Sequence, residues 1–300
     1  MARLFNSYVI VDWSAASKPV EGADSIWIGA LAPNARNQLV FKSSNPSTRA
    51  KAEAEINELL SAYAKRGDRT LVGFDFPLGF PEGSAKALKL KSEKPWAETW
   101  DFIAKGIRDK PDNTNNRFVL GARMNHVISG DAFPFWGCPP RDEVSTLKAK
   151  RFRQHEAGDL PEFRRAEALA KGAQPVWKLY YNASVGGQAL TGIPVVKRLR
   201  EAPARIEKSA VWPFETGWKP LSESDLEGVE VVFAEVFPSS LKPVVKPGEV
   251  KDEAQVKAMA EHLAQLDQAG KIGALFGPKT RPDYADSIET EEGWILGVQP

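Results

Sequence analysis

The chain contains little cysteine and little histidine, and this limits the chemistry available to it. Cys138 is the single cysteine among 300 residues, so no disulfide can form within the chain. Its context, G-C-P-P, has neither a CxxC partner nor a local catalytic-triad signature. The three histidines, His126, His155 and His262, do not have the spacing of metal ligands. The composition therefore argues against histidine-based metal sites and against a nucleophilic cysteine.

Long apolar runs and an excess of one charge are also absent. No stretch approaches the roughly 18 apolar residues of a membrane span. The N-terminus, where Arg3, Asn6 and Ser7 precede a strand, lacks the apolar core of a signal peptide. With 40 basic and 39 acidic residues the net charge is +1, so nucleic-acid binding would need a local basic patch. These features favour a cytoplasmic globular protein.

Acidic residues stand at the ends of several apolar segments. V-I-V at 9–11 runs into Asp12, L-V-G-F at 71–74 into Asp75, and V-V-F-A at 231–234 into Glu235. Each segment is typical of a buried strand, and a carboxylate at its end is costly to desolvate unless something pairs with it. For Asp12 alone, a turn aspartate that caps the next bend through Ser14 is an equal alternative. The recurrence, with Asp286 in an expected C-terminal helix, favours a divalent-metal site.

The order of elements predicts an α/β fold with a mixed central sheet and flanking helices. Strands are expected at 8–12, 25–31, 38–42, 70–74, 210–214 and 229–237. Helices are expected after Ser47 or Thr48, after Pro194, at 252–268, and from Pro282 towards Leu296. Short polar links predict an antiparallel meander for the first three strands. The strand at 70–74 is nearly continuously apolar, which suits the centre of a sheet, and we expect it beside the first strand.

From about residue 86 to 178 the strand pattern gives way to a region rich in aromatic residues and arginine. Helical segments are expected at 95–107 and 160–171. The aromatic residues are Trp96, Trp100, Phe102, Phe118, Phe133, Phe135, Trp136 and Trp177. They favour a small satellite core, with a basic, aromatic groove for nucleic acid as the alternative. We expect a mostly helical insertion within a single domain spanning 1–300, forming one wall of a cleft over the acidic strand ends.

Several converging carboxylates are typical of a site for Mg²⁺ or Mn²⁺. Magnesium prefers carboxylate oxygens and keeps several waters, and two divalent ions roughly 4 Å apart can clamp a phosphodiester. The candidate ligands are Asp12, Asp75, Glu235, Asp283 and Asp286. The candidates for holding the phosphates of a nucleic acid or nucleotide are Ser14, Lys18, Arg123, Arg151 and Arg153.

Five stretches resemble a family of uncharacterised bacterial proteins described as predicted nucleases with a ribonuclease H-like fold. They are V-I-V-D-W-S at 9–14, G-F-D-F-P-L-G-F-P at 73–81, S-V-G-G-Q-A-L-T-G-I-P at 184–194, V-F-A-E-V-F-P-S at 232–239 and D-Y-A-D-S-I at 283–288. The resemblance spans the chain except the insertion. Its D-x-P-L-G and E-V-x-P turns are moderately specific, whereas isolated aspartates are not.

The resemblance implies a ribonuclease H-like domain with metal-dependent nuclease activity. It places Asp12, Asp75, Glu235 and Asp286 at the metal-ligand positions and implies catalytic roles for them. The chain departs from the family at D-Y-A-D-S-I, where we expect D-A-L after the aspartate, so the ligand from this helix is either Asp283 or Asp286. The insertion is also long for the family.

Two other functions remain open at this stage. The segment D-W-S-A-A-S-K at 12–18 resembles the first phosphate loop of actin-like ATPases and sugar kinases, in which a strand-end aspartate holds magnesium. Those proteins duplicate the core, and only one copy is present here, without a second glycine-rich phosphate turn. The third hypothesis is a non-catalytic nucleic-acid-binding scaffold, because a fold does not fix a function.

Overall fold

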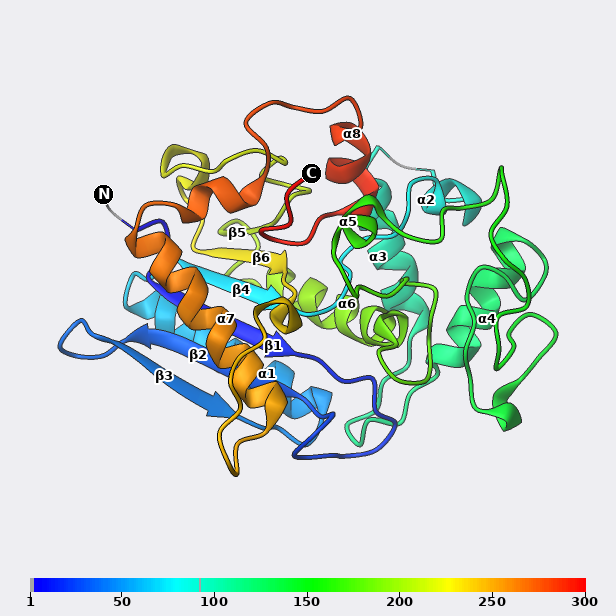
Figure 1. Cartoon of the computed structure of the whole chain (residues 1–300), viewed down its shortest axis with the longest axis horizontal. Helices are drawn as coiled ribbons and strands as arrows, with labels where there is room; N and C mark the ends of the chain where they lie inside the picture. Colours follow the sequence, from blue (N-terminus) through cyan, green and yellow to red (C-terminus); the bar gives the residue numbers. More distant parts are fainter. Residues whose placement is uncertain (1–2, 92) are drawn as a thin grey trace.

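The computed structural model describes residues 3–91 and 93–300, and a six-stranded mixed sheet lies at its centre (Figure 1). The strands are β1 (Ser7–Asp12), β2 (Trp27–Pro33), β3 (Leu39–Ser44), β4 (Thr70–Phe74), β5 (Ser209–Val211) and β6 (Val231–Glu235). Their order is β3-β2-β1-β4-β6-β5. β1, β2 and β3 form an antiparallel meander, whereas β4, β6 and β5 run parallel to β1. The α/β class, the meander and the pairing of the first strand with that at 70–74 are confirmed.

Parallel pairing brings the ends of three strands to one edge of the sheet. Val11 pairs with Phe74, and Phe74 pairs with Glu235, so the three acids follow one another across adjacent strand ends. The backbone N–H of Asp75 donates to the carbonyl of Val11 at 3.2 Å, which extends the pairing beyond the end of β4. This is the carboxyl edge of the sheet, where open α/β sheets bind their ligands.

Alternation along β1 divides the core into two layers. Val9 and Val11 face α1 (Arg49–Lys65) and α6 (Val185–Glu201), whereas Tyr8 and Ile10 face α7 (Lys251–Gln268). α7 crosses β1 and β2 on the face nearest the viewer in Figure 1. Thr48 caps α1, because its hydroxyl accepts the N–H of Lys51 at 3.3 Å.

The chain between β4 and α6 lies beside the sheet and consists of short helices joined by long loops, so the expectation of a mostly helical insertion is wrong (Figure 1). Its α-helices are α2 (Ser84–Ala87), α3 (Pro95–Gly106), α4 (Arg117–Ile128) and α5 (Arg165–Leu169). α4 falls outside the helices expected from the sequence. Phe80, Phe135 and Trp177 are buried against one another with ring centroids 4.9–6.2 Å apart. They belong to the same apolar core as Val9 and Val11 of β1, so the expectation of a separate satellite core is wrong.

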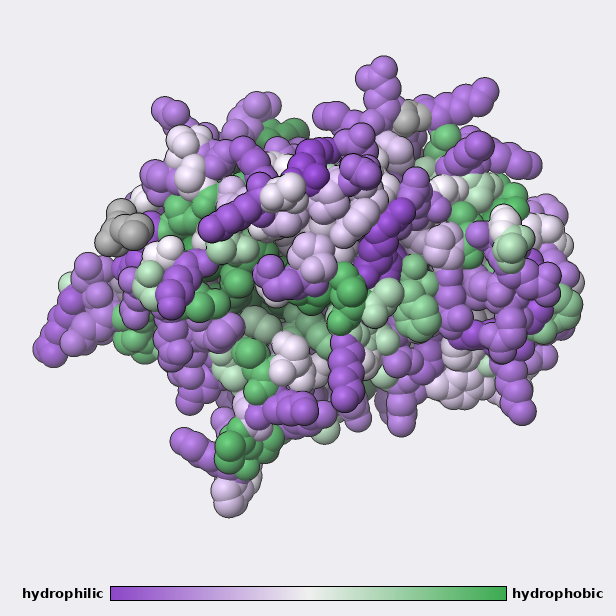
Figure 2. All heavy atoms as spheres, turned by 45° about the horizontal axis from the view of Figure 1, so that its top comes forward, coloured by the Kyte–Doolittle hydropathy of each residue, from purple (hydrophilic) through white to green (hydrophobic). Residues whose placement is uncertain are grey.

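One face of the molecule carries mainly polar side chains. Figure 2 shows hydrophilic side chains over most of one face, with apolar side chains scattered between them. No helix within the described ranges is both long enough and apolar enough to cross a membrane. The near balance of basic and acidic residues agrees with the many surface ion pairs between them, such as that of Arg198 with Glu53 at 2.6 Å.

The last segment differs from the expected long helix. α8 covers only Ala285–Ser287 and continues as a π-helical turn, Ile288–Glu292, which ends at Gly293 with a φ of 66°. Glu291 accepts hydrogen bonds from the backbone N–H groups of Gly83 and Ala85 at 2.7 and 2.6 Å, so this carboxylate faces inward and fixes the turn. The expectation of a helix running towards Leu296 is therefore wrong in its length.

Candidate functional site

Asp12 and Asp75 meet at the carboxyl edge of β1 and β4. Their carboxyl groups share a hydrogen bond, and Oδ1 of Asp75 also accepts the backbone N–H of Trp13 at 2.8 Å. The Trp13 ring is buried against Phe74 and Phe76, each with its centroid 6.1 Å away. The position of the carboxyl pair is therefore fixed by the strand ends and by an aromatic core directly beneath them.

The environment disfavours ionisation of this pair. Burial raises the pKa of Asp75 to about 7. Burial, followed by the negative charge of Asp75, holds the pKa of Asp12 well above its ordinary range. In residues 3–91 and 93–300, neither carboxyl group has a basic ion-pair partner. Both shifts favour the protonated form of these carboxyl groups when no cation is bound.

Two further aspartates lie close to Asp12, and the sequence pattern did not single them out as site residues. Asp12, Asp24 and Asp252 line a cavity of about 600 Å³, and the charges of Asp24 and Asp252 also raise the pKa of Asp12. Asp252 lies in the first turn of α7, and its Oδ2 accepts the backbone N–H of Asp24 at 2.9 Å. The sequence does contain an indication of Asp252, because this acid stands at the start of the helix that follows the third strand ending in an acid.

Glu235 reaches the same edge but is already paired. Arg164 of the insertion is fully buried and donates to both Glu235 carboxylate oxygens, at 2.7 and 2.9 Å. Arg164 also binds Glu167 at 2.9 Å and the carbonyl of Glu292 at 2.9 Å. Burial raises the pKa of Glu235, and the Arg164 charge opposes that shift. Through these two hydrogen bonds from Arg164, both carboxylate oxygens of Glu235 have partners without a metal ion.

Asp283 and Asp286 lie on the C-terminal segment around α8, away from the Asp12 cavity (Figure 1). Both are exposed at the surface. The Asp286 side chain is 89% exposed and pairs with Arg281 at 2.5 Å. The structure therefore brings Asp12 and Asp75 together, places Glu235 on the next strand, and leaves the two C-terminal aspartates outside the site.

The acids do not form a closed metal cage. Within the described ranges, no group of three or more histidine, cysteine, aspartate or glutamate side chains is arranged to hold a metal ion. Magnesium nevertheless uses one or two protein carboxylates and completes its octahedron with waters and substrate oxygens. The hard oxygen donors of Asp12 and Asp75 fit that type of site.

The candidates for phosphate contacts fall into two groups. Arg151 pairs with Glu162 at 2.5 Å, and Arg153 pairs with Asp159 at 2.5 and 2.8 Å, so both already have carboxylate partners. The others retain access to solvent. Ser14 lines the Asp12 cavity, Lys18 lines a larger cavity beside it, and Arg123 is exposed with its guanidinium 5.4 Å from the Phe102 ring.

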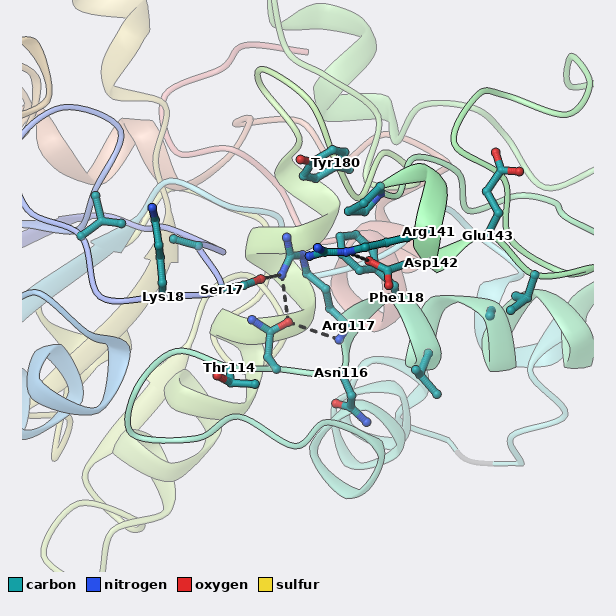
Figure 3. Close-up of a pocket in the computed structure, with 17 residues that line it drawn as sticks. Ser17, Lys18, Thr114, Asn116, Arg117, Phe118, Arg141, Asp142, Glu143 and Tyr180 are labelled. Atoms are coloured by element: carbon teal, nitrogen blue, oxygen red, sulfur yellow. Dashed lines mark hydrogen bonds and ion pairs between the residues drawn. The ribbon is translucent and has the colours of Figure 1, made fainter.

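The larger cavity has a volume of about 890 Å³ and lies between the loop after β1 and the insertion (Figure 3). Ala16, Arg117 and Tyr180 line both this cavity and the one at Asp12. Figure 3 shows Arg117 between Ser17 on one side and Phe118 on the other. The insertion thus forms one wall of the larger cavity, which adjoins the cavity lined by Asp12, whereas Asp75 and Glu235 line a separate, smaller cavity. The sequence did not distinguish Arg117 from the other arginines of this region.

Comparison with models of protein families, with curated proteins and with solved structures finds no match. The assignment of function therefore depends on the geometry and electrostatics of the site.

Proposed function

We propose that this protein hydrolyses phosphodiester bonds of nucleic acids or nucleotides with Mg²⁺ or Mn²⁺ as its cofactor. The observation that supports this most strongly is the contact between Asp12 and Asp75, two carboxyl groups withdrawn from water and from every basic side chain in the described ranges. Two unit charges 4 Å apart interact by about 4 kcal/mol at an effective dielectric constant near 20. A divalent cation between them would turn this repulsion into attraction.

The residues at the strand ends have distinct roles in this proposal. Asp12 and Asp75 would ligate the ion directly, and such an ion activates a water and stabilises the leaving oxygen. Asp24 and Asp252, on the same cavity, would orient water molecules around it. Glu235 would act with Arg164 as structural support from the neighbouring strand, because its oxygens are occupied.

We further propose that the fold is ribonuclease H-like. The support is an antiparallel meander of three strands, a helix, and a fourth strand parallel to the first, with acids at the ends of β1 and β4. The acidic helix of the site would be α7, which packs on β1 and β2 and starts beside Asp12. This differs from the sequence-based expectation that the segment at 283–288 supplies the helical ligand.

Metal titration combined with a cleavage assay tests the proposed function. Mg²⁺ and Mn²⁺ are titrated calorimetrically into wild-type protein and into Asp12→Asn, which keeps the shape of the side chain and removes its charge. Both proteins are then incubated with DNA, RNA and nucleotide substrates. We expect wild type to bind metal and to cleave, and Asp12→Asn to do neither. Glu207→Gln, which removes a charge from an exposed residue, is the matched control and should behave as wild type.

Three outcomes would contradict the proposal in different ways. Wild-type protein that binds neither ion and cleaves none of these substrates would favour a binding scaffold. Cleavage of ATP alone would favour nucleotide-dependent phosphotransfer. Cleavage that persists in EDTA would assign the chemistry to Asp12 and Asp75 acting as an acid and a base without metal, as paired carboxyl groups with a shared proton can do.

A further inference from the structure

Arg117, the first residue of α4, is a buried cation without a carboxylate partner. Its Nη1 donates to Oγ of Ser17 and to Oδ1 of Asn115, each at 2.9 Å, and both acceptors are neutral. Its guanidinium carbon lies 4.2 Å from the centroid of the Phe118 ring. The residue is only 5% exposed, and its Nε has no hydrogen-bond partner among the described residues. The charge of Arg117 is therefore largely buried and has no carboxylate in direct contact among the described residues.

Arg49 shows how the fold neutralises a comparable buried arginine. Its Nε and Nη2 bind the two carboxylate oxygens of Asp109 at 2.5 and 2.6 Å, and its remaining donors reach backbone carbonyls. Among the described residues, no carboxylate binds Arg117 in this two-bonded way. Burial and the neighbouring Arg49 charge instead lower the pKa of Arg117 to about 10. An ion withdrawn from water without a counter-ion is strongly unfavourable, so the ligand-free protein lacks an anion at this position.

The position of Arg117 indicates where that anion belongs. Arg117 stands in the wall shared by the Asp12 cavity and the cavity of about 890 Å³ (Figure 3). The larger cavity is lined by the rings of Phe118 and Tyr180, which meet edge to face at 5.7 Å, and by Val119 and Val144. Lys18 and Arg141 add positive charges to its lining, and Asp142 and Glu143 add negative ones. Its volume lies within the roughly 300–1,000 Å³ of small-molecule sites.

We propose that Arg117 binds a phosphate group of a nucleotide unit whose nucleoside occupies the larger cavity against Phe118 and Tyr180. A guanidinium recognises phosphate oxygens through a planar array of donors, and aromatic side chains provide stacking surfaces for bases. The phosphate would thus be held where the two cavities share lining residues, on the side of Asp12. Binding of a nucleotide in this cavity does not depend on the proposed function. Only the statement that this nucleotide is part of the substrate rests on it.

Binding measured in EDTA tests the inference separately from metal chemistry. Adenosine monophosphate, inorganic phosphate and adenosine are titrated into wild type, Arg117→Met and Arg36→Met. Arg36 is an exposed arginine in the β2–β3 hairpin, at the opposite end of the sheet, so its variant matches the change in net charge. We expect wild type to bind the nucleotide more tightly than either fragment. Arg117→Met should weaken nucleotide binding by about 10-fold or more, the effect of one lost charged hydrogen bond, and Arg36→Met should not.

A second variant tests the nucleoside part of the site separately from the phosphate part. It also provides a test if Arg117→Met does not fold. Val119 is 68% exposed on the larger cavity, and Val119→Trp would fill it without removing Arg117. This variant should lose nucleotide affinity and retain the affinity for inorganic phosphate. Absence of nucleotide binding to wild type, or equal affinities in wild type and both cavity variants, would overturn the inference. The proposed hydrolase would then remain testable by its metal binding at Asp12.

Discussion

The backbone N–H of Trp13 donates to Oδ1 of Asp75 at 2.8 Å, which ties the residue after Asp12 to the neighbouring strand end. Together with the pairing of β1 and β4, this bond keeps two carboxyl groups in contact although their charges repel. The contact is favourable only while a proton or a cation lies between them. The free energy of unfolding of the metal-free protein should therefore fall as the pH rises.

Raising the pH from about 4 to about 7 should destabilise the metal-free protein. The ordinary pKa of aspartate is 3.8, whereas burial raises that of Asp75 to about 7 in the folded state. Between these values the folded state binds more protons than the unfolded state, so the free energy of unfolding falls as pH rises. Three pKa units at about 1.4 kcal/mol each give an upper limit of about 4 kcal/mol for the contribution of Asp75 alone.

Urea denaturation in EDTA at pH 5 and at pH 8 measures this effect. Asp75→Asn can still accept the Trp13 N–H but cannot ionise, so it should show a smaller loss of stability between the two pH values. At pH 8 it should also be more stable than wild type. Mg²⁺ should restore stability to wild type at pH 8 and have little effect on the variant. The same pH dependence in both proteins would show that Asp75 ionises normally.

Arg164 should contribute more to stability than any surface arginine of the insertion. Arg164→Met would leave Glu235 and Glu167 buried without their shared counter-ion. Removing one partner of a buried ion pair typically costs about 3–5 kcal/mol. Urea denaturation at pH 7.5 measures this loss against Arg123→Met as the exposed comparison, which should change stability by less than about 0.5 kcal/mol. A small effect of Arg164→Met would mean that the ion network does not stabilise this edge of the sheet.

The sheet and the acidic strand ends could be predicted from the sequence because local patterns determine them. The apolar runs at 9–11, 71–74 and 231–234 have nearly equal lengths and each ends in an acid. Parallel pairing of such runs places their acids at one edge. The partners of those acids could not be predicted in this way. Arg164 binds Glu235 across 71 positions of sequence, and no periodicity marks it among the other arginines.

α4 illustrates why the insertion was harder to predict. The helix contains Gly121, whose cost in a helix interior is about 1 kcal/mol relative to alanine. A Cβ atom at this position would lie 2.4 Å from Cδ1 of Leu179, so any larger residue would force this buried side chain of a distant segment to shift. Tertiary contact thus overrides local propensity. Arg117, at the start of the same helix, is also buried by tertiary contacts. That it has no counter-ion can therefore be recognised only in the folded structure.

Asp252, and not Asp286, should affect metal affinity. Asp252 shares a cavity with Asp12 and raises its pKa, whereas the Asp286 side chain is 89% exposed and bound to Arg281. Residues that orient the ligands or waters of a metal typically change its affinity about 10- to 100-fold. Mg²⁺ titration of Asp252→Asn should show a loss in that range, and the same titration of Asp286→Asn should match wild type. If only Asp286→Asn loses affinity, the C-terminal segment supplies the helical ligand and must move towards β1 when metal binds. If neither variant changes affinity, Asp12 and Asp75 hold the ion with water alone.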